Sequence, residues 1–209
     1  MEALMALLRK YPALEICKAD IEKAFLLIKD TYQKGGKLLV CGNGGSAADS
    51  EHIVGELMKG FMLDRKISES TRVRIKEVSE TNGDYISDNL QGALPAISLV
   101  SHSALISAFS NDIAPDMIFA QQVFGYGKPG DSFLGLSTSG NSKNVIYAAE
   151  TARALGMHTI AFTGKSGGSL KQICDCTILA PSKSTPAIQE YHLPIYHTLC
   201  MMLEYEFFA

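Results

Sequence analysis

Apolar and polar residues follow one another along this chain in two kinds of pattern. Within residues 1–34, apolar side chains recur three or four positions apart, which is typical of amphipathic helices. We expect two helices there, separated at Pro12 and ended by Gly35 and Gly36. From residue 94 onward, short apolar runs alternate with amphipathic segments. Alternating strands and helices predict a parallel sheet that is covered by helices on both faces.

Five short apolar runs give the expected strands, at residues 37–42, 94–100, 132–136, 158–162 and 176–180. Helices are expected at residues 46–59, 103–110, 115–126, 142–155 and about 186–207, with a short helical piece after Gly168. The fold class that follows is α/β: a three-layer αβα sandwich with a five-stranded parallel sheet and an N-terminal helical extension. We expect one domain over residues 1–209.

Residues 62–91 interrupt this regular pattern. The segment is polar and charged, with weak helical periodicity at residues 67–78 and a turn expected at Asn82 and Gly83. We therefore interpret it as an excursion from the core of the domain.

Composition narrows the class of protein. The formal net charge is −3, and the 19 lysine and arginine residues are scattered, which argues against direct nucleic-acid binding. We expect neither a signal peptide nor a membrane span, because the longest uncharged stretch contains glycine, proline and several serines. The five cysteines lie in apolar surroundings, as reduced core residues of a cytoplasmic protein do.

Three polar turns follow expected strands, and the parallel sheet places them at one edge: GNGGS, STSGNS and TGKSGG. In the second turn, four hydroxyl groups precede a helix whose N-terminus attracts anions. These are Ser137, Thr138, Ser139 and Ser142. The simplest structural role would be helix capping, but capping needs only one hydroxyl. The pattern therefore favours a phosphate site.

The first turn precedes a helix that carries His52 and Glu56 four residues apart, so that both lie on one face. Such a pair is most often a solvated surface pair. Its position one turn beyond a glycine-rich strand end makes it a candidate for proton transfer or metal binding instead. The same turn fits a dinucleotide motif, but no acidic residue ends the next strand, so we expect no nicotinamide cofactor.

Four segments together carry a family resemblance: CGNGGSAADSEH, LSTSGNSKNVI, GKSGG and IQEYHLPIYH. From about residue 20 to the end, except for residues 62–91, the chain resembles the flavodoxin-like sugar isomerase (SIS) domain, and within it the phosphoheptose isomerases. The resemblance implies an aldose–ketose isomerase that interconverts sedoheptulose 7-phosphate and a heptose 7-phosphate. It also implies a homotetramer with active sites between subunits and one zinc ion at each site.

The resemblance also implies roles for individual residues. It implies zinc ligands at His52, Glu56, Gln189 and His197, phosphate contacts at Ser137, Thr138, Ser139 and Ser142, and sugar contacts at Asn43, Ser46 and Gln189. Isomerisation removes a proton beside a carbonyl and returns it to the neighbouring carbon through an enediolate. Our hypothesis is that Glu56 carries this proton and that His197 serves the oxygens or acts as a second acid or base. A Lewis-acidic metal would stabilise the oxyanion.

One feature of the ligand set conflicts with simple helix geometry. Eight residues of helix separate Gln189 from His197 by about 12 Å along the axis. Pro194 would have to kink or restart the helix, or two subunits would each supply part of the site, so we expect an obligatory oligomer.

Three alternatives stay open. One is a non-catalytic SIS-domain protein, such as one that binds a replication initiator, and the others are a sugar-phosphate sensor and an isomerase of another phosphorylated ketose. His102 and the Lys59–Gly60 pair depart from the family pattern, where an aspartate and an arginine are common, so substrate contacts there are expected to differ.

Overall fold

The structure is a computed structural model and describes residues 2–209. Its centre is a five-stranded sheet in the order β2-β1-β3-β4-β5, in which every neighbouring pair is parallel. The strands are β1 (Leu38–Gly42), β2 (Ala96–Ser98), β3 (Ser132–Leu136), β4 (His158–Thr163) and β5 (Cys176–Leu179). The predicted α/β fold with a five-stranded parallel sheet is therefore confirmed.

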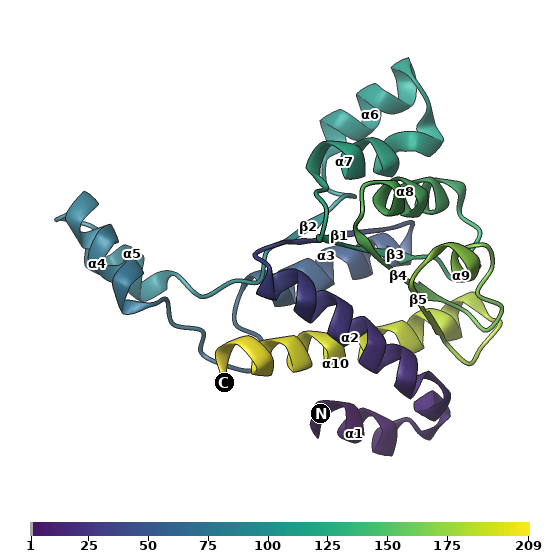
Figure 1. Ribbon diagram of the computed structural model, residues 1–209, viewed down its shortest axis with the longest axis horizontal. Coiled ribbons are helices and arrows are strands. Elements are labelled where there is room, and N and C mark those ends of the chain that lie inside the picture. Colours follow the sequence, from purple (N-terminus) through teal and green to yellow (C-terminus); the bar gives the residue numbers. More distant parts are fainter. Residues whose placement is uncertain (1) are drawn as a thin grey trace.

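Helices form a layer on each side of the sheet (Figure 1). One layer contains α1 (Glu2–Lys10), the 3₁₀ helix η1 (Pro12–Cys17), α2 (Lys18–Gln33), α3 (Gly45–Met58) and α10 (Thr185–Phe208). The other contains α6 (Ser103–Asp112), η2 (Pro115–Met117), α7 (Ile118–Tyr126), α8 (Lys143–Ala154) and α9 (Leu170–Ile173). No helix within residues 2–209 is both long and apolar enough to cross a membrane.

Two hydrophobic cores lie on opposite faces of the sheet because successive strand residues point to opposite sides. In β1, Leu38 and Val40 pack in the core beneath α2, α3 and α10, whereas Leu39 and Cys41 pack in the core beneath α7 and α8. All five residues of β1 are buried, as expected for a strand of a sheet covered on both faces.

The strand order reverses at β1, which lies between β2 and β3. Gly42 pairs with Leu136, so the turns that follow β1 and β3 leave the sheet side by side. Ligands of open α/β sheets bind in the crevice at such a reversal. The topology therefore brings GNGGS and STSGNS together at the carboxyl edge.

The excursion consists of two short helices, α4 (Glu69–Val78) and α5 (Gly83–Asn89), which lie side by side and extend away from the rest of the molecule (Figure 1). No residue of α4 is buried. Ion pairs hold the two helices together, between Arg72 and Asp88 and between Lys76 and Asp84.

Three local expectations differ from the structure. Strand β2 has only three residues, because it is an edge strand that pairs with β1 alone. The turn expected at Asn82 and Gly83 ends at Asn82, and Gly83 already belongs to α5. Helix α10 continues through Pro194, and the Thr198 hydroxyl donates to the Pro194 carbonyl oxygen at 2.8 Å. The proline therefore neither ends nor restarts this helix.

Candidate active site

The STSGNS turn forms a hydroxyl-lined cradle at the N-terminus of α8. The hydroxyls of Ser137 and Ser142 lie 2.9 Å apart, and Gly140 adopts a left-handed conformation with φ of +68°. The first N–H groups of α8 have no acceptor within the helix, so they are available to an anion. Ser137 is buried, Thr138 is partly buried and Ser139 is exposed.

The GKSGG turn and the residue after it pack against the cradle. The Asn141 side-chain oxygen accepts hydrogen bonds from the Ser169 N–H at 2.9 Å and from the Ser169 hydroxyl at 3.0 Å. A Cβ atom on Gly140 would lie only 2.0 Å from the Gly167 carbonyl oxygen. The two turns are therefore packed too closely for any residue but glycine at position 140.

The GNGGS turn joins the cradle from the other side. Asn43 and Asn144 exchange two side-chain hydrogen bonds of 2.9 Å, which link the turn after β1 to the first turn of α8. Ser46 is buried at the start of α3, and a Cβ on Gly42 would lie 2.5 Å from the Ser46 carbonyl oxygen. Asn43 is exposed at the edge of the cradle.

A second cluster lies two turns further along α3. His52 Nε2 is 3.3 Å from Glu56 Oε1 and 3.4 Å from His197 Nε2, so α3 and α10 bring these three side chains together. The other Glu56 oxygen lies 3.5 Å from Lys59 Nζ. The side chain of His52 is 42% exposed and that of Glu56 only 13%, so the cluster opens to solvent on the histidine side.

Burial and the proximity of His52 lower the pKa of His197, and the Glu56 carboxylate offsets only part of this effect. A lowered pKa favours the neutral imidazole near neutral pH. His197 is therefore expected to offer a lone pair to a proton or a metal ion.

Gln189 lies apart from these three residues in the same chain. Its amide packs over the start of α3, where a Cβ on Gly45 would come within 2.6 Å of Nε2. Helix α10 is continuous between Gln189 and His197, which keeps them about 12 Å apart. The structure thus places Gln189 near the GNGGS turn rather than beside His197.

The donor types of the cluster suit zinc, which binds imidazole nitrogen and carboxylate oxygen. Two ligands of a tetrahedral zinc ion, each about 2.0–2.1 Å from the metal, lie roughly 3.3–3.4 Å apart. The His52–Glu56 and His52–His197 distances match this spacing. Across residues 2–209, however, no three histidine, cysteine, aspartate or glutamate side chains are grouped closely enough to hold a metal ion between them.

Two residues that the sequence did not single out touch this cluster. The Tyr196 hydroxyl lies 2.9 Å from His52 Nδ1 and 3.3 Å from Asp49 Oδ1. Asp49 is three residues before His52, and Tyr196 immediately precedes His197. This closeness in sequence to two candidate ligands is the only signal that could have pointed to them.

The two positions that depart from the family pattern have structural partners here. His102 lies just before α6, with Nδ1 at 2.6 Å from the side-chain oxygen of the buried Gln122. The Gly60 N–H donates to Gln91 at 2.8 Å, at the base of the excursion. His192 is buried, with its Nε2 atom 3.2 Å from the Thr163 carbonyl oxygen.

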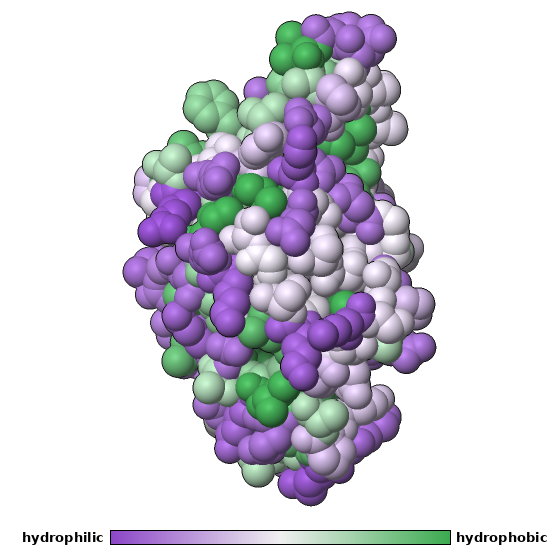
Figure 2. All heavy atoms as spheres, turned by 90° about the vertical axis from the view of Figure 1, so that its right-hand side faces the viewer, coloured by the Kyte–Doolittle hydropathy of each residue, from purple (hydrophilic) through white to green (hydrophobic). Residues whose placement is uncertain are grey.

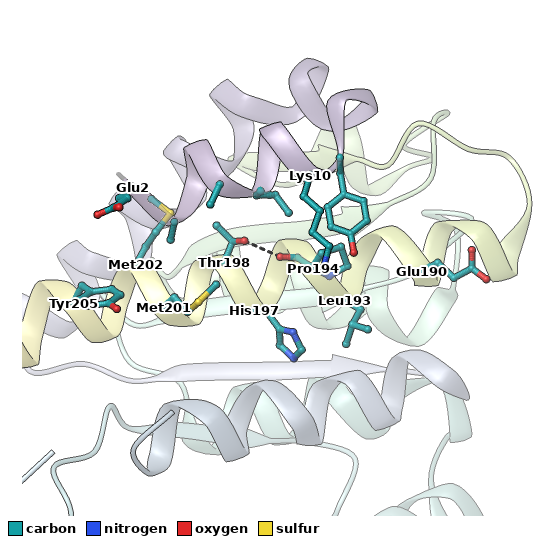
Figure 3. A pocket seen from close by; sticks show the side chains of 14 residues that line it. Glu2, Lys10, Glu190, Leu193, Pro194, His197, Thr198, Met201, Met202 and Tyr205 are labelled. Carbon is teal, nitrogen blue, oxygen red and sulfur yellow. Dashed lines mark hydrogen bonds between the residues drawn. The ribbon is translucent and has the colours of Figure 1, made fainter. Parts of the chain in front are cut away.

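A groove of about 820 Å³ runs between α1 and α10, and His197 lies at its edge (Figure 3). Apolar side chains of α10 line it, among them Leu193, Met201 and Met202. The face of the molecule seen in Figure 2 has a different character, since polar residues cover most of it and apolar ones appear as small separate patches. The His197 cluster thus adjoins a surface hollow lined largely by apolar side chains, with Glu2, Lys10 and Glu190 also in its lining.

Comparison with known proteins adds the family. A sequence model described as the SIS domain matches residues 4–92 and 91–164. The phosphoheptose isomerase of Citrifermentans bemidjiense is 42% identical over 189 residues, which are 90% of this chain and 85% of that one. This chain belongs to the SIS domain family of phosphoheptose isomerases.

Solved structures agree with this assignment. The phosphoheptose isomerase GmhA of Neisseria gonorrhoeae matches with a TM-score of 0.73 and 31% identity, covering 95% of this chain and 94% of that chain. The phosphoheptose isomerase of Francisella tularensis matches with a TM-score of 0.74 and 30% identity, covering 98% and 94% of the two chains. The resemblance of the sequence to the phosphoheptose isomerases is therefore confirmed.

Proposed function

We propose that this protein is an aldose–ketose isomerase that interconverts sedoheptulose 7-phosphate and a heptose 7-phosphate. The observation that carries the proposal is the convergence of His52, Glu56 and His197 two helical turns beyond the phosphate cradle. Helix α3 begins beside the cradle and carries His52 and Glu56, so one rigid element links both parts of the site. The names of the related proteins support the same reaction.

The phosphate group would bind at the N-terminus of α8. Ser137, Thr138, Ser139 and Ser142 supply hydroxyl donors there, and the helix dipole favours a dianion without a nearby cation. Asn43, Ser46 and Gln189 line the path from this cradle along α3, which fits contacts with the sugar hydroxyls. The phosphate would thus fix one end of the substrate and set the carbonyl end toward Glu56.

Glu56 would carry the proton between carbons. Its carboxylate removes a proton from C1 of the ketose, which gives an enediolate, and then delivers that proton to C2. In the same step the C1 hydroxyl loses its proton and the C2 oxygen gains one, a transfer that the neutral His197 imidazole is placed to perform.

We also propose one zinc ion per site, held by His52, Glu56 and His197, with Gln189 as a fourth ligand. A zinc ion supplies Lewis-acid stabilisation of the developing oxyanion when it is bound. The two distances around His52 support these first three ligands, and the three side chains would have to move closer together to hold the ion. Because Gln189 is too far away along the same helix, the complete set would include Gln189 of a second subunit or a shift of α10.

A homotetramer with active sites between subunits would resolve this separation. The open side of His52 and the apolar groove beside His197 support a subunit contact at this place. We place the reaction in the cytoplasm, because all five cysteines are free thiols. The net charge of −3 favours a small-molecule substrate over nucleic acid.

The test is the variant Glu56→Gln, which preserves shape but removes the base. We expect turnover of sedoheptulose 7-phosphate to fall by at least about 1000-fold, within the range typical of general bases, while calorimetry still detects substrate binding. Glu150→Gln, on the exposed face of α8, is the matched control and should keep wild-type activity.

Two results would reject the proposal. If Glu56→Gln retained turnover, the proton would be carried elsewhere. If the wild type bound sugar phosphates but converted none of a panel of phosphorylated ketoses, the protein would be a non-catalytic SIS-domain binder or a sensor.

A further inference from the structure

The hydroxyl of Tyr196 lies between an acid and an imidazole that belong to the neighbouring helix. The tyrosine itself is only 1% exposed, and its ring packs edge-on against His52 and His197, with centroid distances of 5.4 and 5.0 Å. The Tyr196 hydroxyl oxygen lies 2.9 Å from His52 Nδ1 and 3.3 Å from Asp49 Oδ1. Asp49 and His52 are one turn apart on α3, so the hydroxyl bridges one face of that helix.

The starting point for the His52 tautomer is the hydrogen bond that the Tyr196 hydroxyl donates to Asp49 Oδ1. A tyrosine hydroxyl has one proton to donate, and an ionised carboxylate can only accept. The Tyr196 proton therefore goes to Asp49, and the tyrosine oxygen is left to accept a hydrogen bond. The only donor that His52 can present to it is a protonated Nδ1 atom.

A neutral imidazole carries a proton on one nitrogen only, so a protonated Nδ1 leaves the Nε2 lone pair free. This atom faces Glu56 Oε1 at 3.3 Å and His197 Nε2 at 3.4 Å. The opposite tautomer would direct an N–H at those two groups and would block the lone pair. The Asp49–Tyr196 pair thus decides which side of His52 can act.

We propose that Tyr196, held by Asp49, is a positioning residue that keeps His52 protonated on Nδ1 and leaves Nε2 free toward Glu56 and His197. The effect of this arrangement on zinc binding rests on the proposed function, whereas the hydrogen bonds among Asp49, Tyr196 and His52 do not. Outer partners of this kind orient metal-binding histidines and raise their affinity.

The first test is ¹⁵N NMR of the imidazole nitrogens in metal-free protein, at a pH above the histidine titration range. The His52 signals, assigned with His52→Gln, should show the Nδ1–H tautomer in the wild type. Tyr196→Phe removes the acceptor, and Asp49→Ala frees the tyrosine proton to turn toward His52. Both variants should shift His52 toward the Nε2–H tautomer.

The matched control is Tyr191→Phe, which removes a hydroxyl from the same helix at a partly buried position. It should leave the His52 tautomer unchanged, and thermal melting of each variant checks that the fold persists. An Nε2–H tautomer in the wild type would overturn the inference, and so would a tautomer that neither Tyr196→Phe nor Asp49→Ala changes.

The second test is zinc affinity, measured by competition with a chromophoric chelator. Tyr196→Phe and Asp49→Ala should each weaken binding by about 10- to 100-fold, as for other outer partners of metal-binding histidines, and Tyr191→Phe should not. If these variants bind zinc as tightly as the wild type, the inferred consequence is wrong. A wild type that binds no zinc yet shows the expected tautomers would reject the metal in the proposed function and support the positioning role.

Discussion

The ion pair between Arg65 and Glu204 is the interaction whose loss should destabilise this fold most clearly. The side chains of both residues are fully buried, and Arg65 Nε donates to Glu204 Oε1 at 2.7 Å. The remaining Arg65 N–H groups donate to the carbonyl oxygens of Leu57 at 2.7 Å and Glu56 at 2.9 Å, at the end of α3. One arginine therefore ties the helix that carries Glu56 to α10.

The Glu204 carboxylate also accepts hydrogen bonds from the backbone. The backbone N–H groups of Phe61 and Met62 each donate to one of its oxygens at 2.8 Å. Replacing Glu204 by glutamine would leave the Arg65 charge buried without its partner, because no other carboxylate forms an ion pair with Arg65 in the described part of the chain. Removing one member of a buried pair typically costs about 3–5 kcal/mol.

For a protein of this size, that loss corresponds to a fall in melting temperature of about 6–20 °C. We expect it for Glu204→Gln and for Arg65→Met, measured by urea unfolding and calorimetry. The double variant should be less destabilised than the sum of the two single variants, since neither charge is then left unpaired. Single variants within about 1 kcal/mol of the wild type would refute the reasoning, because that is the range of a surface pair.

Acid should weaken the same interaction. Burial raises the pKa of Glu204, but the hydrogen bonds from Phe61, Met62 and Arg65 together lower it by more, so the pKa lies below its usual value. A carboxyl whose pKa is lowered on folding contributes stability above its unfolded pKa and loses it as the pH falls through the folded value. The stability difference between wild type and Glu204→Gln should therefore shrink below about pH 4, near the usual glutamate pKa.

Three further predictions concern the site. Ser142→Ala removes a hydroxyl of the cradle, and it should raise KM for sugar phosphate about 10- to 100-fold, the worth of one hydrogen bond to a charged group, with kcat less affected; an unchanged KM would contradict the cradle. Gly140→Ala forces a Cβ to within 2.0 Å of the Gly167 carbonyl oxygen at a left-handed φ, so thermal melting should show a loss above about 2 kcal/mol, and wild-type stability would contradict the packing. Burial, and to a smaller extent His52, lower the pKa of His197. The value of kcat/KM should therefore stay level as the pH falls to about 6.5, where an ordinary histidine titrates, and decline only below that pH. A decline centred above that pH would contradict the role of His197.

Local sequence patterns were enough to predict the sheet and the turns at its carboxyl edge. Apolar runs such as that of β1 are buried on both faces, which a parallel sheet with two helical layers requires. Helix spacing placed His52 beside Glu56 correctly, because residues four apart on a helix are neighbours in any surroundings.

Contacts between distant parts of the chain could not be predicted in the same way. Tyr196 and Asp49 are 147 residues apart, and Arg65 and Glu204 are 139 apart, so no local pattern joins them. The path of α10 through Pro194 depends on packing against α1 and α3, which can hold a helix that proline alone would disfavour. The separation of Gln189 from His197 followed from helix geometry, but only the fold shows that Gln189 lies beside Gly45.

The central claim is that Glu56 transfers a proton between carbons of a bound sugar phosphate. Incorporation of solvent deuterium into sedoheptulose 7-phosphate and its product, followed by proton NMR in heavy water, tests this most directly. The wild type should exchange hydrogen at C1 of the ketose or C2 of the aldose, and Glu56→Gln should exchange neither. Exchange by Glu56→Gln at the wild-type rate would contradict the claim.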